Sequence, residues 1–221
     1  MYNYRVLLDT CVLYNMPACD LLIRLSLHDH CQLKWTERSR ESAITHILEK
    51  NTHLSRDRVA NRLVKMEEAV NDWEASELKT AMSLDFRGIP VNDRYIVSAA
   101  MHSQCDAILT FNKKDFPEEI VAPYGLEILD PDCFIIHQCD LFKSSREKVV
   151  DIVSCILFSL RDPNYTVDIY VQKLEAAQLK ETANFVSNSK PMIEKGLQEL
   201  YDRIPKEKKV IPIDAWQRKK S

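Results

Sequence analysis

A short apolar run that ends on a carboxylate limits the fold more than any other feature of this sequence. Residues 4–8 (YRVLL) lead directly into Asp9, and such a run predicts a buried β-strand. A carboxylate that follows a buried strand needs a partner, because an unpaired charge is costly to bury. Asp9 is therefore expected at the end of a central strand, where it either serves a function or meets a structural counter-charge.

Strand and helix patterns alternate through about residue 137. Further short strands are predicted at 33–36, 106–110 and 126–129, and a turn at 130–132 leads into the apolar residues 134–136. Helices are predicted at 18–28, 36–50, 55–71 and from 92 or 93 onward, with Thr36 and Ser55 as N-caps. The alternation indicates an α/β fold with a parallel central sheet.

After residue 137 the pattern is helical, with helices predicted at about 143–161, 166–180 and 189–203. A chain of 221 residues suits one domain with an extension. We therefore expect an α/β domain at 1–137, a helical extension at 138–204 and a flexible tail at 205–221. The tail holds six basic and two acidic side chains, so the rest of the chain is acidic, which argues against simple electrostatic binding of nucleic acid.

Composition excludes several classes of protein. With only 3 Gly, the chain has no Gly-rich phosphate-binding loop. Its 7 Cys include no C-x-x-C pair, which is typical of a protein from a reducing cytosol. No apolar run approaches the length that spans a membrane, and the first residues do not resemble a signal peptide. We expect a cytoplasmic protein that does not act at a membrane.

Four acids are predicted to meet at one edge of the sheet. Sites in parallel sheets form at the carboxyl ends of the strands, where Asp9, Asp115 and the first turn of the helix that contains Asp93 are expected. Glu41, one turn into a helix after another short strand, can face the same edge. Each acid alone is equally consistent with a surface charge or a helix cap. Together they favour Mg²⁺ or Mn²⁺, which bind oxygen ligands and promote phosphodiester hydrolysis.

The acids lie in segments that resemble the motifs of PIN-domain nucleases, in particular the VapC-like toxins. The four segments are 6–14 (VLLDTCVLY), 35–41 (WTERSRE), 92–100 (NDRYIVSAA) and 107–117 (AILTFNKKDFP). Further matches at 122–126, 130–132, 161–163 and 166–170 extend the resemblance to about residue 185. The resemblance implies a three-layer α/β/α fold with a central parallel sheet and a helical C-terminal extension.

The same resemblance implies a divalent-metal-dependent endoribonuclease, often the toxin of a type II toxin–antitoxin pair. Its substrate would be RNA and its partner a cognate antitoxin protein. Asp9, Asp93 and Asp115 would bind Mg²⁺ or Mn²⁺, and Glu41 would bind metal or help to deprotonate water. Two supporting residues, Thr110 and Asn112, are expected to orient Asp9 or a water, or else to cap a local turn. Asn92 stands where a second Asp is common in this subgroup, so either one metal ligand is weaker or Asn92 supports the site by contacting the metal through its amide oxygen. Arg38 and Arg40 flank the second acid, which leaves Glu37 as a substitute for Glu41.

Several alternatives remain open on the sequence alone. Arg94, Lys113 and Lys114 lie beside proposed ligands and either contact substrate phosphates or are solvated surface charges. A PIN fold without catalysis would act as an RNA- or protein-binding module, and a DNA-directed nuclease would use the same acids. The helical extension either covers the sheet, mediates a homodimer or receives the antitoxin.

Overall fold

A four-stranded parallel sheet forms the centre of the computed structural model, which describes residues 4–76, 86–140, 145–160 and 165–203. The strands are β1 (Arg5–Leu8), β2 (Gln32–Lys34), β3 (Ala107–Leu109) and β4 (Glu127–Leu129). Their order is β2-β1-β3-β4, and each neighbouring pair is parallel. The α/β class with a parallel sheet, expected from the alternating pattern, is confirmed.

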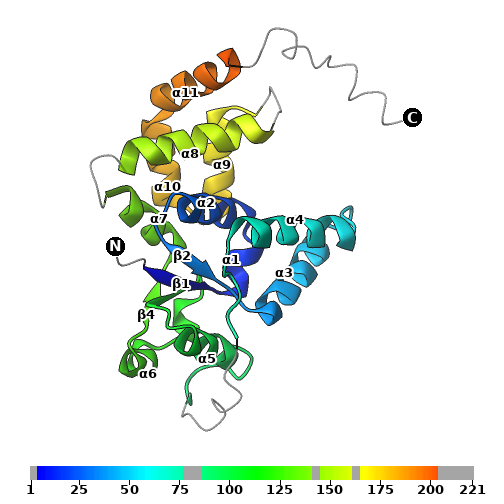
Figure 1. Ribbon diagram of the computed structural model, residues 1–221, viewed down its shortest axis with the longest axis vertical. Coiled ribbons are helices and arrows are strands. Elements are labelled where there is room, and N and C mark those ends of the chain that lie inside the picture. Colours follow the sequence, from blue (N-terminus) through cyan, green and yellow to red (C-terminus); the bar gives the residue numbers. More distant parts are fainter. Residues whose placement is uncertain (1–3, 77–85, 141–144, 161–164, 204–221) are drawn as a thin grey trace.

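Helices cover both faces of this sheet, because successive side chains of a strand point to opposite faces. In β1, Val6 and Leu8 belong to one hydrophobic cluster and Leu7 belongs to the other. The helices of the first cluster are α1 (Thr10–Tyr14), α2 (Met16–Leu27), α3 (Glu37–Lys50) and α4 (Arg56–Ala69). The second cluster contains residues of α5 (Arg94–His102) and α6 (Glu118–Val121). Figure 1 shows α5 and α6 on the face of the sheet opposite α2.

The C-terminal helices pack on the α2 side of the sheet. They are α7 (Pro131–Asp140), α8 (Ser145–Leu160), α9 (Val167–Ala176), α10 (Lys180–Asn188) and α11 (Lys190–Asp202), and in Figure 1 α8 to α11 lie beyond α2 and α7 as seen from the sheet. Val153, Leu174 and Ile193 of this region belong to the same buried cluster as Val6. The architecture is compatible with a PIN-like α/β/α fold that carries a helical extension. None of the described helices is long and apolar enough to cross a membrane.

Local capping explains where several helices begin. Asn15, Thr36, Ser55 and Thr166 each accept a hydrogen bond from the backbone N–H three residues later, which starts α2, α3, α4 and α9. The apolar residues 134–136 lie inside α7, because Asp130 accepts hydrogen bonds from the N–H groups of Asp132 and Cys133 and starts a helix there.

The structure also differs from the expected elements, for example at α1 and at the end of α9. Residues 10–14 form the short helix α1, which was not expected. The helix expected at 166–180 ends at Ala176, because Gln178 adopts a left-handed φ of 65°, and α10 then begins at Lys180. Two parts of the expected pattern, residues 161–163 and the basic tail at 205–221, lie outside the described residues. The division at residue 137 remains a prediction, and that position lies within α7.

Candidate active site at the carboxyl edge of the sheet

Asp9 follows β1 directly and is held against the end of β3. Its backbone N–H donates to the carbonyl of Leu109 (3.0 Å), so the side chain lies beside Thr110, the residue that follows β3. The Thr110 hydroxyl donates to Asp9 Oδ2 at 2.7 Å, and the Cys11 thiol donates to the same oxygen at 3.0 Å. Both side chains are buried, with Asp9 6% exposed and Thr110 fully buried. The carboxylate is thereby fixed through one oxygen.

Cys11 contributes to this arrangement as a protonated thiol. Burial, with a smaller contribution from the Asp9 charge, raises the pKa of Cys11 to about 12. The sulfur in turn accepts a hydrogen bond from the Phe111 N–H (3.3 Å). Among the hydrogen bonds of the described residues, Thr110 and Cys11 both use Oδ2. Asp9 Oδ1 is thus the oxygen that can face a ligand.

Asp93 and Asp115 share this edge of the sheet with Asp9. Asp93 immediately precedes α5, and Asp115 ends the 3-10 helix η2 (Lys113–Asp115) after β3. Burial raises the pKa of Asp93 above its ordinary value, and the charges of Asp9 and Asp115 raise it further, while Arg38 lowers it. Three of the four predicted acids therefore interact electrostatically across elements that are far apart in sequence.

The carboxylates do not form a complete metal cage as they stand. Within the described part of the chain, no three His, Cys, Asp or Glu side chains lie close enough together to hold a metal ion. Asp9, Asp93 and Asp115 nevertheless repel one another, and a divalent cation would relieve that repulsion. Mg²⁺ commonly binds through one or two carboxylates and keeps several waters, so this oxygen-only set fits Mg²⁺ or Mn²⁺.

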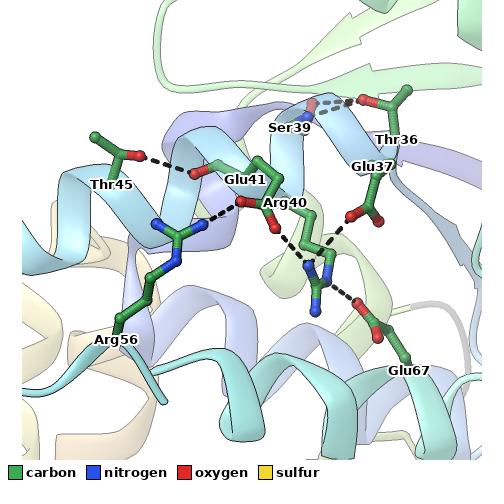
Figure 2. A network of polar contacts seen from close by, with 8 residues as sticks. All are labelled: Thr36, Glu37, Ser39, Arg40, Glu41, Thr45, Arg56 and Glu67. Carbon is green, nitrogen blue, oxygen red and sulfur yellow. Dashed lines mark hydrogen bonds and ion pairs between the residues drawn. The ribbon is translucent and has the colours of Figure 1, made fainter. Parts of the chain in front are cut away.

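Glu41 lies in a different network, between α3 and α4 (Figure 2). Its Oε1 accepts a hydrogen bond from Arg40 at 2.6 Å, and its Oε2 accepts one from Arg56. Glu37 also pairs with Arg40. Glu41 is not among the charges that shift the pKa of Asp93. The structure thus places both candidates for the second acid in ion pairs with arginines.

The other predicted residues take varied positions. The backbone N–H of Asn112, rather than its amide side chain, donates to the Thr110 hydroxyl at 3.0 Å. Asn92 is exposed, as are Lys113 and Lys114 on η2. Arg94 donates through Nε to the carbonyl of Ile89 (3.1 Å), so part of its guanidinium is held by the protein backbone.

Arg38 and Tyr95 lie near the acids, and the sequence assigned no role in the site to either of them. The Arg38 guanidinium carbon lies 4.1 Å from the centre of the Tyr95 ring. The Tyr95 hydroxyl is within hydrogen-bond distance of the Ser39 hydroxyl (3.0 Å) and of the Thr10 hydroxyl (3.3 Å). The sequence offered two signals for this pair. Arg38 is a basic residue in the first turn of α3, and Tyr95 comes two residues after Asp93.

Comparisons with known proteins relate part of this chain to a VapC-type ribonuclease. A segment of 58 residues is 34% identical to a curated protein of Mycobacterium tuberculosis whose name is "Putative ribonuclease VapC50". The segment makes up 26% of this chain and 34% of the relative, so the chain spans about a third of the length of that protein. No family model and no solved structure matches the chain. The similarity agrees at this coarse level with the resemblance of the sequence motifs.

Proposed function

We propose that the protein is a divalent-metal-dependent endoribonuclease that hydrolyses phosphodiester bonds of RNA. The observation that carries the proposal is the buried Asp9 carboxylate, fixed through Oδ2 by Thr110 and Cys11 beside the charges of Asp93 and Asp115. The partial similarity to a protein named as a ribonuclease supports the choice of RNA.

Each acid of the site has a distinct position in this proposal. Asp9 would bind Mg²⁺ or Mn²⁺ through Oδ1, because its other oxygen receives the two hydrogen bonds from the protein. Asp93 and Asp115 would complete the site directly or through waters. The metal would stabilise charge on the phosphate and lower the pKa of a water that it binds. Glu41 has no role here while Arg40 and Arg56 bind its carboxylate.

We further propose that the protein is the toxin of a type II toxin–antitoxin pair. The motif resemblance carries this step, and it predicts a cognate antitoxin protein as partner. Co-expression with the product of a neighbouring gene should restore growth to cells that the chain alone inhibits. Growth that is unaffected by the chain alone, although the purified protein cuts RNA, would contradict the toxin role.

The decisive experiment is cleavage of end-labelled RNA by purified protein. Single-stranded and structured RNAs are incubated with Mn²⁺, Mg²⁺ or EDTA beside the Asp9→Asn variant. Asp151→Asn is the matched control, because Asp151 is exposed on α8. We expect metal-dependent cutting that Asp9→Asn abolishes and Asp151→Asn retains, with internal fragment ends. Cutting of DNA but not RNA under the same conditions would assign the site to a DNA-directed nuclease.

One observation favours a second candidate, a binding module without catalysis. No three acids of the described residues stand ready to hold a metal, and Glu41 is paired with arginines. The two candidates differ in metal binding, since a ligand that binds only the folded state raises its melting temperature. A nuclease should gain melting temperature with Mn²⁺, and Asp9→Asn should lose that gain. Absence of both the gain and RNA cleavage would favour the binding module.

A further inference from the structure

Arg38 stands at the rim of the carboxylate edge on a support built from three helices. Its guanidinium lies over the Tyr95 ring, 4.1 Å from the centre of that ring. The Tyr95 hydroxyl is tied to Ser39 on α3 and to Thr10 at the start of α1. The ring therefore cannot turn away without breaking two hydrogen bonds. It holds the guanidinium beside α5, two residues from Asp93.

Stacking leaves the donors of Arg38 available to a ligand. A guanidinium that lies over an aromatic ring uses its face for that contact and keeps its N–H groups at the edges. Within the described part of the chain, Arg38 takes part in no ion pair with a carboxylate. Arg40, two residues further on, bonds to Glu37, Glu41 and Glu67. Among the described residues, Arg38 thus differs from Arg40 in having no hydrogen bond or ion pair that occupies its N–H groups.

We propose that Arg38, held by Tyr95, binds a backbone phosphate of the RNA next to the bond that is cut. Arginine donates two parallel hydrogen bonds to phosphate oxygens. At an edge that carries Asp9, Asp93 and Asp115, a fixed positive charge would also reduce repulsion of the polyanion. This inference rests on the proposed function for its substrate, and it makes Arg38 a substrate-binding residue rather than a metal-site residue.

The alternative is that Arg38 serves only as a counter-charge for Asp93. The two roles predict different salt behaviour. Affinity for single-stranded nucleic acid falls with salt, with a slope of about 0.7 per phosphate that is neutralised. Removing a phosphate contact should lower that slope by about this amount. Removing a counter-charge that touches no RNA should change stability and leave the slope unchanged.

The test measures RNA binding and cleavage separately. Binding of a fluorescent single-stranded RNA is measured by anisotropy at several salt concentrations in the Asp9→Asn background, which prevents cutting. Arg38→Gln should weaken binding by about tenfold, the size of a bidentate contact to a charged group, and lower the salt slope by about 0.7. Arg38→Lys should keep the slope while losing part of the affinity.

Lys50→Gln is the matched control. Lys50 also lies over an aromatic ring, with its Nζ 4.6 Å from the centre of the Tyr14 ring at the other end of α3. The control should leave both affinity and slope unchanged. In the active background, Arg38→Gln should raise KM by about the same factor as it raises Kd.

Three outcomes decide the matter. If the unmodified protein cuts RNA and Arg38→Gln changes neither affinity nor salt slope, the phosphate-binding role is overturned and the nuclease stands. The role is also overturned if Arg38→Gln lowers only the melting temperature. If the unmodified protein does not cut RNA while Arg38→Gln still weakens binding and lowers the slope, the nuclease proposal fails and Arg38 remains an RNA-binding residue.

Discussion

At the scale of single residues, Asp9 shows how the fold keeps a buried carboxylate in one orientation. Two short hydrogen bonds to one oxygen offset part of the cost of removing that oxygen from water. The donors come from Thr110 at the end of β3 and from Cys11 at the start of α1. A change at either donor should therefore affect stability and the site together.

Thr110→Val removes the hydroxyl while keeping the shape of the side chain. We expect the free energy of unfolding to fall by about 1.5–3 kcal/mol, the usual contribution of a hydrogen bond to a charged group. The Asn112 N–H also loses its acceptor. Urea unfolding measures the change. Thr45→Val is the control, because the Thr45 hydroxyl is exposed and donates to a carbonyl of its own helix. Equal effects of the two changes would contradict the role given to Thr110.

Asp93 gives a prediction about pH. Its pKa is raised in the folded protein, so the folded state binds this proton more tightly than the unfolded state does. The Asp93 charge therefore reduces stability at neutral pH, and the reduction disappears as the pH falls through the folded pKa towards the ordinary value of 3.8. In EDTA, Asp93→Asn should melt above the unmodified protein at pH 7, with a smaller difference at lower pH. Added Mn²⁺ should reverse the order.

Melting curves in EDTA between pH 7 and pH 4 provide the measurement, with Asp151→Asn as the control for loss of a surface charge. A difference in melting temperature that stays constant across this range would show that Asp93 does not carry the repulsion. RNA cleavage should be lost in Asp93→Asn even where its stability is higher, because the proposed metal site needs the charge.

At the scale of elements, an ion-pair network connects α3 to α4 (Figure 2). Arg40 and Glu67 are both largely buried, at 14% and 15% side-chain exposure. Arg40→Gln should lower the free energy of unfolding by roughly 3 kcal/mol, because it leaves the Glu67 carboxylate without its partner and near two other acids. The burial that already raises the pKa of Glu67 would then act without the opposing effect of Arg40.

Chemical denaturation of three variants tests this reading. Arg40→Gln with Glu67→Gln should recover part of the loss, since both charges are then absent. Arg56→Gln is the control, because its pair with Glu41 is exposed and should contribute less than about 1 kcal/mol. If Arg56→Gln destabilised as much as Arg40→Gln, burial would not explain the strength of the network.

The sequence predicted the elements whose signals are local. Thr36 and Ser55 were expected as N-caps, and both accept the capping hydrogen bond. The start of α10 could not be predicted in this way, since Leu179 precedes it and has no side chain that can cap. Asp132 of α7 supplies the cap from 49 residues away. Contacts of this length depend on the packed fold and leave no pattern in neighbouring residues.

The candidate site follows the same rule. The shared location of Asp9, Asp93 and Asp115 was predictable, because Asp9 and Asp115 follow strands of a parallel sheet and Asp93 starts the helix that leads into β3. Their role as metal ligands stays a prediction. The ion pairs of Glu41 were not predictable, because they depend on which arginines of α3 and α4 lie beside its carboxylate in the folded protein. The contact of Arg38 could not be predicted from its neighbours in the sequence, because it depends on Tyr95 from another helix.

At the scale of the whole molecule, Asp132 joins the start of α10 to α7, the helix that follows β4. Its carboxylate is buried and accepts hydrogen bonds from Glu181 N–H (2.7 Å), Thr182 N–H (2.8 Å) and the Thr182 hydroxyl (2.6 Å). Asp132→Ala should lower the free energy of unfolding by about 2–3 kcal/mol, because it removes a cap and leaves buried donors unpaired.

Hydrogen exchange should locate that loss in α10 and the helices it touches. Asp168→Ala is the control, since Asp168 pairs with Lys190 at an exposed position. Asp132→Asn keeps one oxygen acceptor and should cost less than Asp132→Ala. Exchange that rises uniformly across the sheet and the extension would show that the contact does not act locally on α10.

The pairing of β1 with β3 also has a consequence for how the chain is made. Asp9 leaves the ribosome early, but the strand that positions it ends at Leu109 and the last acid is Asp115. A nascent chain shorter than this cannot assemble the site. If the protein is the nuclease proposed above, a fragment released before Asp115 is made would lack the site and should not cut RNA.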